Sequence, residues 1–167
     1  GDRRNHKNLF YTIDLIKNFN HKYKQKFNLL IAGSKSYKNT KLQKYIDENL
    51  FVKEIINPND NLLDDLYRNC ELLILLSKDE GFGIPVIEAA SRSKKIVISN
   101  ISALKEVAPE NSLVLDLEST NDHMNLLHNY LNKSVEINTQ NIFEKWSWDK
   151  SSLILKELIL STLSTKI

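Results

Sequence analysis

Apolar residues follow two kinds of spacing along this chain. Short apolar runs of strand length predict buried strands, and they occur at residues 27–31, 52–56, 72–76, 96–98 and 113–115. Between these runs, apolar residues recur every three or four positions, which is typical of one face of a helix. That spacing predicts helices near residues 9–19, 42–46, 62–67, 85–91, 103–107, 120–132, 138–145 and 149–163. Strands that alternate with helices predict an α/β fold, in which helices cover both faces of a parallel sheet.

Length and composition fit one globular domain. The chain has 167 residues, of which 41% are hydrophobic and 26% are charged, as is usual for such a domain. A net charge of +2 is too small to indicate a nucleic-acid partner. Cys70 is the single cysteine, so an internal disulfide is excluded and a reducing compartment is favoured. The sequence contains no run of the roughly 20 apolar residues that a helix needs to cross a bilayer.

The segment after the third apolar run carries the most informative chemistry. Leu72–Leu76 predicts a buried strand, and residues 80–88 read Glu-Gly-Phe-Gly-Ile-Pro-Val-Ile-Glu. Glu80 and Glu88 are the first and last residues of this segment, with seven residues between them. A buried strand that passes through a short loop into a helix forms the edge at which open α/β sheets bind ligands.

Each residue type in this loop has a physical reason to be there. Gly81 and Gly83 permit positive φ and let a ligand approach the backbone closely, and Pro85 suits the first helical position. The helix start offers backbone N–H groups and a partial positive charge, which suit a phosphate. Glu88 then lies in the first turn, where its carboxylate can accept two hydrogen bonds from a vicinal diol such as a ribose. The alternative interpretation is an ordinary turn with two solvated carboxylates.

The segment resembles the signature of the retaining glycosyltransferases of family 4, usually written E-G-F-G-x-P-x-x-E-A. The resemblance extends over nearly the whole chain, from an opening loop at 1–8, through a strand that ends at Gly33, to Trp146 before the last helix. It implies that residues 1–167 form one Rossmann-like, nucleotide-sugar-binding domain, the C-terminal half of a two-domain GT-B enzyme. It also implies that a central strand before Gly1 and an N-terminal acceptor domain are absent here. The neighbouring strands would then have exposed edges, which favour association.

The resemblance assigns roles to particular residues. It implies that Glu80 is the catalytic residue beside the reacting sugar, as a nucleophile or as an electrostatic partner, and that Glu88 binds the ribose. The implied donor-binding residues are Arg3, Arg4, Lys7, Gly33, Phe82, Gly83, Ile84, Glu88, Ser99 and Leu104. Lys7, with Arg3 or Arg4, would bind the diphosphate in place of a metal ion, although a solvated basic turn is the alternative for these residues. Residues 82–84 would donate backbone N–H groups, Ser99 and Leu104 would line the diphosphate side, and Gly33 would lie near the base.

The resemblance also limits the substrates and partners. The opening loop looks most like that of mannosyl- or rhamnosyl-transferring members, which implies GDP-mannose, or else a UDP-sugar, as donor and no metal cofactor. The implied acceptor is a glycan or lipid-linked glycan in surface polysaccharide or lipopolysaccharide synthesis. The implied location is cytoplasmic, with at most peripheral membrane contact. Two alternatives stay open: a glycogen- or sucrose-synthase-like glucosyltransferase using ADP- or UDP-glucose, and a non-catalytic module that binds a nucleotide or a partner protein. The chain alone is expected to transfer no sugar.

Overall fold

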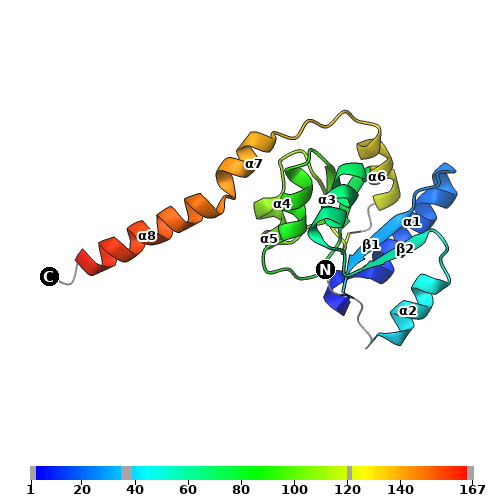
Figure 1. Ribbon diagram of the computed structural model, residues 1–167. Coiled ribbons are helices and arrows are strands. Elements are labelled where there is room, and N and C mark those ends of the chain that lie inside the picture. The colour runs from blue at the N-terminus through cyan, green and yellow to red at the C-terminus, as the bar shows by residue number, and fades with distance from the viewer. Residues whose placement is uncertain (1–2, 35–38, 120–121, 165–167) are drawn as a thin grey trace.

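The computed structural model describes residues 3–34, 39–119 and 122–164 (Figure 1). Its strands are β1 (Leu29–Gly33), β2 (Val52–Ile56), β3 (Leu72–Leu75), β4 (Lys95–Ser99) and β5 (Leu113–Leu115). Its helices are η1 (Asn5–Lys7), α1 (Leu9–Tyr23), α2 (Thr40–Asp47), α3 (Asp60–Asn69), α4 (Ile84–Ala90), α5 (Ser102–Val107), α6 (His123–Leu131), α7 (Thr139–Lys145) and α8 (Trp148–Ser164). The predicted alternation of strands and helices is confirmed, while the predicted start of a helix at 120 falls outside the described residues.

All described strands pair in parallel, but they form two sheets. One sheet contains β1 and β2, and the other has the order β3-β4-β5. Within the described ranges, β1 pairs only with β2 and β3 pairs only with β4. Each therefore has one edge without a strand partner among the described residues. The expected opening loop begins at Gly1 and Asp2, which lie outside the described residues.

Helices cover both faces of the larger sheet, as the sequence predicted. Strand β4 shows this most clearly because its buried side chains alternate between two clusters. Val97 packs with side chains of α1 and α6, whereas Ile96 and Ile98 pack with side chains of α4, α5 and α7. The strand is almost uniformly apolar for this reason, since a strand buried on both faces has no polar side.

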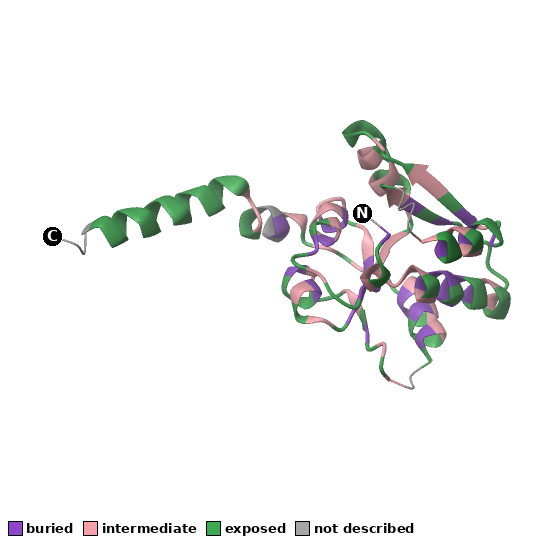
Figure 2. Cartoon of the chain, turned by 90° about the horizontal axis from the view of Figure 1, so that it is seen from below, coloured by how far each residue is buried: buried purple, intermediate pink, exposed green. Residues whose placement is uncertain are grey.

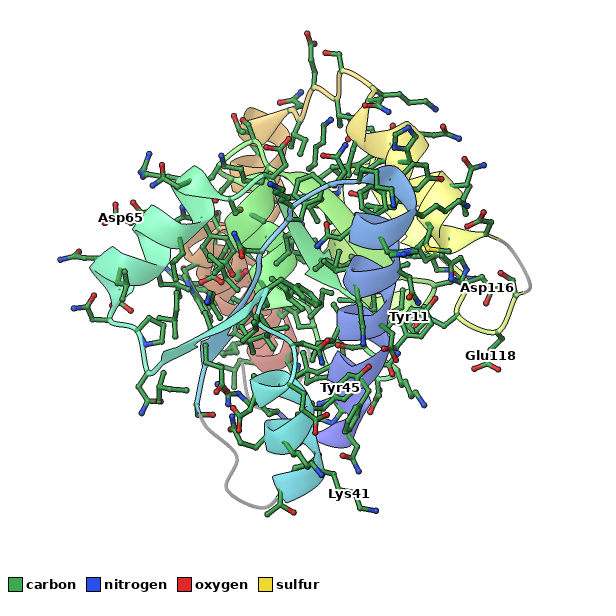
Figure 3. All side chains as sticks on the ribbon, turned by 90° about the vertical axis from the view of Figure 1, so that its right-hand side faces the viewer. Tyr11, Lys41, Tyr45, Asp65, Asp116 and Glu118 are labelled. Carbon is green, nitrogen blue, oxygen red and sulfur yellow. The ribbon has the colours of Figure 1, made fainter. Side chains whose placement is uncertain are left out.

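Helix α1 contacts both sheets. Ile13 is fully buried in the cluster that α1 and α2 form over β1 and β2. One turn along, Leu15, Ile16 and Phe19 join the cluster over the larger sheet. The hydroxyl of Tyr45 in α2 also donates to Asp14 of α1, so α2 is tied to the same helix (Figure 3). The two sheets are therefore joined through the packing of α1.

Helix α8 extends away from the rest of the molecule (Figures 1 and 2). Its residues are exposed at every position that the structure describes, including Trp148, which is 91% exposed. Large apolar side chains lie on all sides of this helix: Leu153, Ile154, Leu155, Leu158, Ile159, Leu160 and Leu163. A helix that is apolar all round is typical of one buried in a larger core, so we expect α8 to be covered in the intact protein.

Candidate donor-binding and catalytic site

Glu80 and Lys7 are far apart in the sequence but lie in contact in the structure. Lys7 Nζ lies 2.7 Å from Glu80 Oε1, and both side chains are largely buried. The hydroxyl of Ser77 donates to the same carboxylate oxygen over 2.7 Å. A hydroxyl from the loop after β3 and a cation from η1 therefore hold Glu80 in place through charge-assisted contacts.

Backbone contacts fix this arrangement. The amide N–H of Lys78 donates to the carbonyl of His6 over 2.7 Å, which joins the opening segment to the loop after β3. The chain then turns sharply at Asn8, whose φ of 53° lies in the left-handed region, where Asn is tolerated better than most residues. This turn separates η1 from α1 and leaves Lys7 directed at Glu80.

Gly83 connects the loop to helix α4, and it does so in a conformation that suits glycine. Its φ is +98°, and its carbonyl accepts the amide of Val86 in the first helical turn. A Cβ atom built on Gly83 would lie 2.8 Å from Leu104 Cδ2 and 3.1 Å from Val107 Cγ2. Close approach of α5 and positive φ thus both require glycine. The helix begins at Ile84, one residue before the predicted Pro85, and proline is also tolerated there because the first N–H groups have no intrahelical partner. The prediction that Glu88 lies in the first turn was wrong, because this earlier start places Glu88 in the second turn.

Glu88 is held by a helix on the other side of α4. The Tyr67 hydroxyl of α3 donates to Glu88 Oε2 over 2.8 Å. Burial raises the pKa of Tyr67 well above its usual range, and the nearby carboxylate adds to this effect. Arg92 stacks its guanidinium over the Tyr67 ring at 5.3 Å and donates to the Glu88 carbonyl and to Asp64. The ribose-binding candidate is therefore positioned by a polar network between α3 and α4.

Arg3 and Arg4 differ in their surroundings. Arg3 is 3% exposed and forms an ion pair with Glu54 in the middle of β2, whereas Arg4 is exposed. Both line one pocket beside the opening segment, and Lys7 is not among the residues that line it. The Arg3 guanidinium thus pairs with Glu54, and the expectation that one of the two arginines acts with Lys7 stays a prediction.

Ser99 and Leu104 lie beneath the loop. Both are buried, at 1% and 0% exposure. The Ser99 hydroxyl donates to the carbonyl of Ser77, and Leu104 packs on the α-carbon of Gly83. Both side chains therefore support the loop from below, and their expected place on the diphosphate side stays a prediction.

Phe82, Ile84 and Gly33 lie where a ligand could reach them. Phe82 packs edge-on against Trp146 with 5.1 Å between ring centroids, yet it and Ile84 are exposed. Gly33 ends β1 with a φ of 141°, and its carbonyl accepts the amide of Asn57 after β2. Gly33, the residue expected near the base, is thus adjacent to the turn after β2, at the carboxyl edge of the smaller sheet.

The sequence did not predict the positioning roles of Ser77 and Tyr67. Ser77 and Tyr67 carry the hydroxyls that hold Glu80 and Glu88. The signal for Ser77 was a polar residue directly after a buried apolar run, three positions before Glu80. Tyr67 was noted only as part of a helix pattern, and its partner could not be read from spacing because it lies on another helix.

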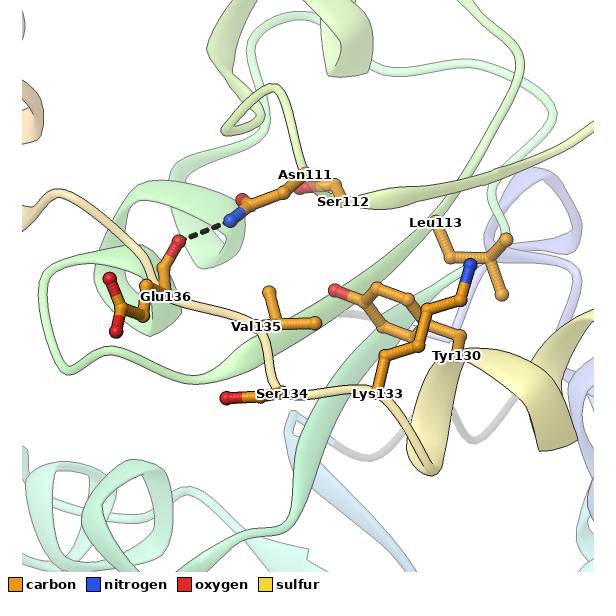
Figure 4. Close-up of a pocket in the computed structure, with 8 residues that line it drawn as sticks. All are labelled: Asn111, Ser112, Leu113, Tyr130, Lys133, Ser134, Val135 and Glu136. Atoms are coloured by element: carbon orange, nitrogen blue, oxygen red, sulfur yellow. Dashed lines mark hydrogen bonds between the residues drawn. The ribbon is translucent and has the colours of Figure 1, made fainter.

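A larger pocket lies elsewhere in the structure, and none of the candidate site residues lines it. It measures about 670 Å³ and lies between the start of β5 and the segment after α6 (Figure 4). Asn111 donates there to the carbonyl of Glu136. This pocket adjoins the amino end of β5, whereas ligands of open α/β sheets bind at the carboxyl ends.

The described part of the chain contains neither a metal-ligand cluster nor a membrane-spanning helix. Among residues 3–34, 39–119 and 122–164, no three or more His, Cys, Asp or Glu side chains are placed to hold a metal ion. Within the same ranges, no helix is both long enough and apolar enough to cross a membrane.

Comparison with known proteins identifies the family. The sequence model of the family described as "Glycosyl transferases group 1" matches residues 1–142. The chain belongs to the group 1 glycosyltransferases. A curated relative, the serotype-specific mannosyltransferase WbdA of Escherichia coli, is 30% identical over 141 residues, which cover 79% of this chain but 17% of WbdA. The chain therefore spans about a sixth of that relative.

Solved structures show that this glycosyltransferase domain has the expected fold. The C-terminal domain of a group 1 glycosyltransferase, LpcC of Francisella tularensis, superposes with a TM-score of 0.71 at 18% identity, covering 87% of this chain and 82% of that one. WaaG, a glycosyltransferase involved in lipopolysaccharide biosynthesis, gives a TM-score of 0.64 at 16% identity and covers 80% of this chain and 36% of WaaG. At such identities the likeness establishes the fold alone. The domain is one Rossmann-like half of the GT-B architecture.

Proposed function

We propose that this chain is the C-terminal, donor-binding domain of a retaining, metal-independent glycosyltransferase. The observation that carries the proposal is the strand–loop–helix unit from β3 to α4, which presents Glu80 and Glu88 and brings Lys7 onto the same loop. In this proposal, Lys7 and the backbone N–H groups at 82–84 stabilise the charge that builds on the departing nucleotide diphosphate. Glu88 accepts the ribose hydroxyls, and Glu80 faces the developing positive charge on the sugar.

The Lys7–Glu80 ion pair suits a site that binds an anion, because an incoming anion can replace Glu80 as the partner of Lys7. A nucleotide diphosphate brings about two negative charges, which compete with Glu80 for the Lys7 ammonium group. If Lys7 turns toward the phosphates, the Ser77 hydroxyl still holds Glu80 Oε1. Glu80 would then be released from its cation at the stage when a positive charge begins to form on the sugar.

We assign mannose, or the related rhamnose, as the transferred sugar, with GDP-mannose as the first donor to test. The support is the likeness of 30% over 141 residues to the mannosyltransferase WbdA. We further propose that the reaction belongs to the synthesis of surface polysaccharide or lipopolysaccharide, with a glycan or a lipid-linked glycan as acceptor.

The proposed partner within the whole protein is an N-terminal acceptor domain, and α8 is the surface that we expect it to cover. Leu155, Leu158 and Leu163 are each more than half exposed. Burying a leucine side chain is worth about 1.5–3 kcal/mol, so the exposed apolar surface of this helix favours a covering domain. Transfer activity is therefore expected only when that domain is present.

The first test is the unfolding temperature of the chain, titrated with UDP, GDP, ADP and dTDP without metal. A ligand at 100 times its dissociation constant adds about 2.7 kcal/mol of stability. We expect one nucleotide to raise the unfolding temperature, and we expect Glu88→Ala to abolish this shift because the ribose contact is lost. A shift with ADP or UDP alone would instead support the glucosyltransferase alternative. The same shift in Glu88→Ala as in the wild type would refute the assigned role of Glu88.

Replacing Tyr67 by phenylalanine tests whether α3 positions Glu88. The change removes one hydroxyl that donates to Glu88 Oε2 and keeps the buried ring. A hydrogen bond to a charged group contributes roughly 1.5–3 kcal/mol, so we expect the affinity for the preferred nucleotide to fall about tenfold. Calorimetric titration measures the affinity, and urea unfolding checks that the fold is retained. Unchanged affinity in Tyr67→Phe would show that Glu88 needs no such support.

A further inference from the structure

A second pocket lies beside the candidate donor site, at the carboxyl edge of the smaller sheet. Its volume is about 460 Å³, and it is formed by the opening segment, the start of α1, the start of α2 and the residue after Ser77. The residues that matter for its chemistry are Arg3, Arg4, Asn8, Asn39, Lys41 and Lys78. Among the described residues that line it there are four cations and no carboxylate. Such a pocket is suited to an anion.

The buried guanidinium of Arg3 gives the clearest sign of a missing ligand. Arg3 is 3% exposed, and its Nη1 atom pairs with Glu54. Its Nε and Nη2 atoms are buried and have no hydrogen-bond partner among the described residues. The other oxygen of Glu54 already accepts from Gln43 over 2.8 Å. Buried donors without partners are rare and unfavourable, and an oxyanion in the pocket would supply acceptors for them.

The start of α1 adds to the positive potential. Helix α1 has 15 residues, and its cap residue Asn8 makes no side-chain hydrogen bond to the first turn. The first N–H groups of a helix lack intrahelical partners and carry a partial positive charge. Asn8 and Leu9 both line the pocket, so this helix end faces the same space as Arg3. By contrast, the start of α2 is already capped by the Asn39 side chain, which accepts the amide of Leu42.

The pocket is adjacent to the donor site but is built from different side chains. Lys7, Glu80 and the residues of α4 do not line it. Lys78 reaches it from a position only two residues before Glu80. A group bound here would therefore lie close to the reacting centre without using the residues that the donor site uses.

We propose that this pocket binds a phosphate group, in addition to the phosphates held by Lys7 and the loop before α4. The phosphate would be carried by a separate molecule, the acceptor, because both phosphates of the donor are already assigned to Lys7 and the loop before α4. The proposal does not depend on the assigned donor or on Glu88. Lys41 and Lys78 are exposed and serve as the cations that complete the site around the buried Arg3.

The test is calorimetric titration of the full chain with inorganic pyrophosphate at low salt, on the wild type and on Lys41→Gln, Lys78→Gln and the double variant. Because charge-assisted hydrogen bonds to phosphate are lost, we expect the double variant to bind at least about tenfold more weakly. The matched control is Lys44→Gln, which removes the same charge one turn further along α2. Lys44 is 79% exposed, and its ammonium lies 3.8 Å from Glu48. Equal weakening in the control, or none in the double variant, would overturn the proposal, as would a chain that does not bind pyrophosphate.

Two further arms separate the second pocket from the donor site. Lys7 is assigned to the donor diphosphate and does not line the pocket, so Lys7→Gln is expected to keep pyrophosphate binding, and loss of binding in that variant would place the anion at the donor site and contradict a second pocket. The second arm is titration in the presence of a saturating nucleotide. Unchanged pyrophosphate affinity supports a phosphate on a separate molecule, whereas competition by the nucleotide would place the pyrophosphate at the donor site and overturn the proposal. Urea unfolding of each variant confirms that the fold is intact.

Discussion

In the enzyme that contains its acceptor domain, Glu80→Gln is expected to lower the rate of sugar transfer roughly 100- to 1,000-fold. The amide keeps the shape of the side chain and can still accept from the Ser77 hydroxyl, which lies 2.7 Å from Glu80 Oε1. It carries no charge, so it cannot stabilise the positive charge that develops on the sugar. Nucleotide affinity is expected to hold or rise, because the ribose contact is assigned to Glu88 and Lys7 no longer pairs with a carboxylate at position 80. Steady-state transfer assays and nucleotide titration together measure the two effects.

The matched control for this prediction is Asp79→Asn. Asp79 is the preceding residue on the same loop and is exposed, so the change removes one negative charge close to the site without touching the Lys7–Glu80 pair. Transfer by this variant should stay within about twofold of the wild type, because exposed charges interact weakly. A similar loss in both variants would mean that the overall charge of the loop, and not the carboxylate of Glu80, supports transfer.

Gly83→Ala is expected to destabilise the domain by about 2–4 kcal/mol, which combines an unfavourable positive φ with overpacking. The new Cβ would lie 2.8 Å from Leu104 Cδ2 and 3.1 Å from Val107 Cγ2. Both neighbours are almost completely buried, so they have little room to move. The loop before α4 must shift instead, and nucleotide binding should weaken with it. Urea unfolding at constant slope measures the change in free energy.

Gly81→Ala is the control for that substitution, two residues earlier in the same loop. A Cβ atom on Gly81 would meet no heavy atom within 4 Å, and Gly81 is not among the residues with positive φ. Its effect on stability is expected to stay within about 0.5 kcal/mol, because the native conformation is open to alanine. Equal destabilisation by both changes would show that loop flexibility, and not the close packing of α5, explains the need for glycine.

The sequence was sufficient to predict the fold because the signals were local. Apolar runs at 72–76 and 96–98 marked buried strands, and glycine and proline at 81–85 marked the turn into α4. The boundaries shifted by a few residues, as at β1, which was expected at 27–31 and lies at Leu29–Gly33. Such shifts arise because strand ends depend on pairing with a neighbour, here β2, and pairing cannot be read from one segment.

The side-chain partners in the site could not be predicted in the same way. Lys7 and Glu80 are 73 residues apart in sequence and meet through a backbone contact between His6 and Lys78. Arg3 was expected on an exposed basic loop, and the structure buries it against Glu54. Spacing along the chain identifies which residue types are available. Their partners follow only from how the elements pack, so the burial of Arg3 and Ser99 could not be read from the sequence.

The packing of α1 has a consequence for how this domain unfolds. The two sheets share no strand pairing among the described residues, and α1 packs on both, through Ile13 over the smaller sheet and Phe19 over the larger one. Much of the cooperativity between the two halves of the domain then passes through this helix, beside the contact of Ile74 in β3 with the cluster over β1 and β2. Amides of β1 and β2 should exchange with solvent through a local opening that leaves β3, β4 and β5 protected. Weakening α1 would turn a single unfolding transition into two.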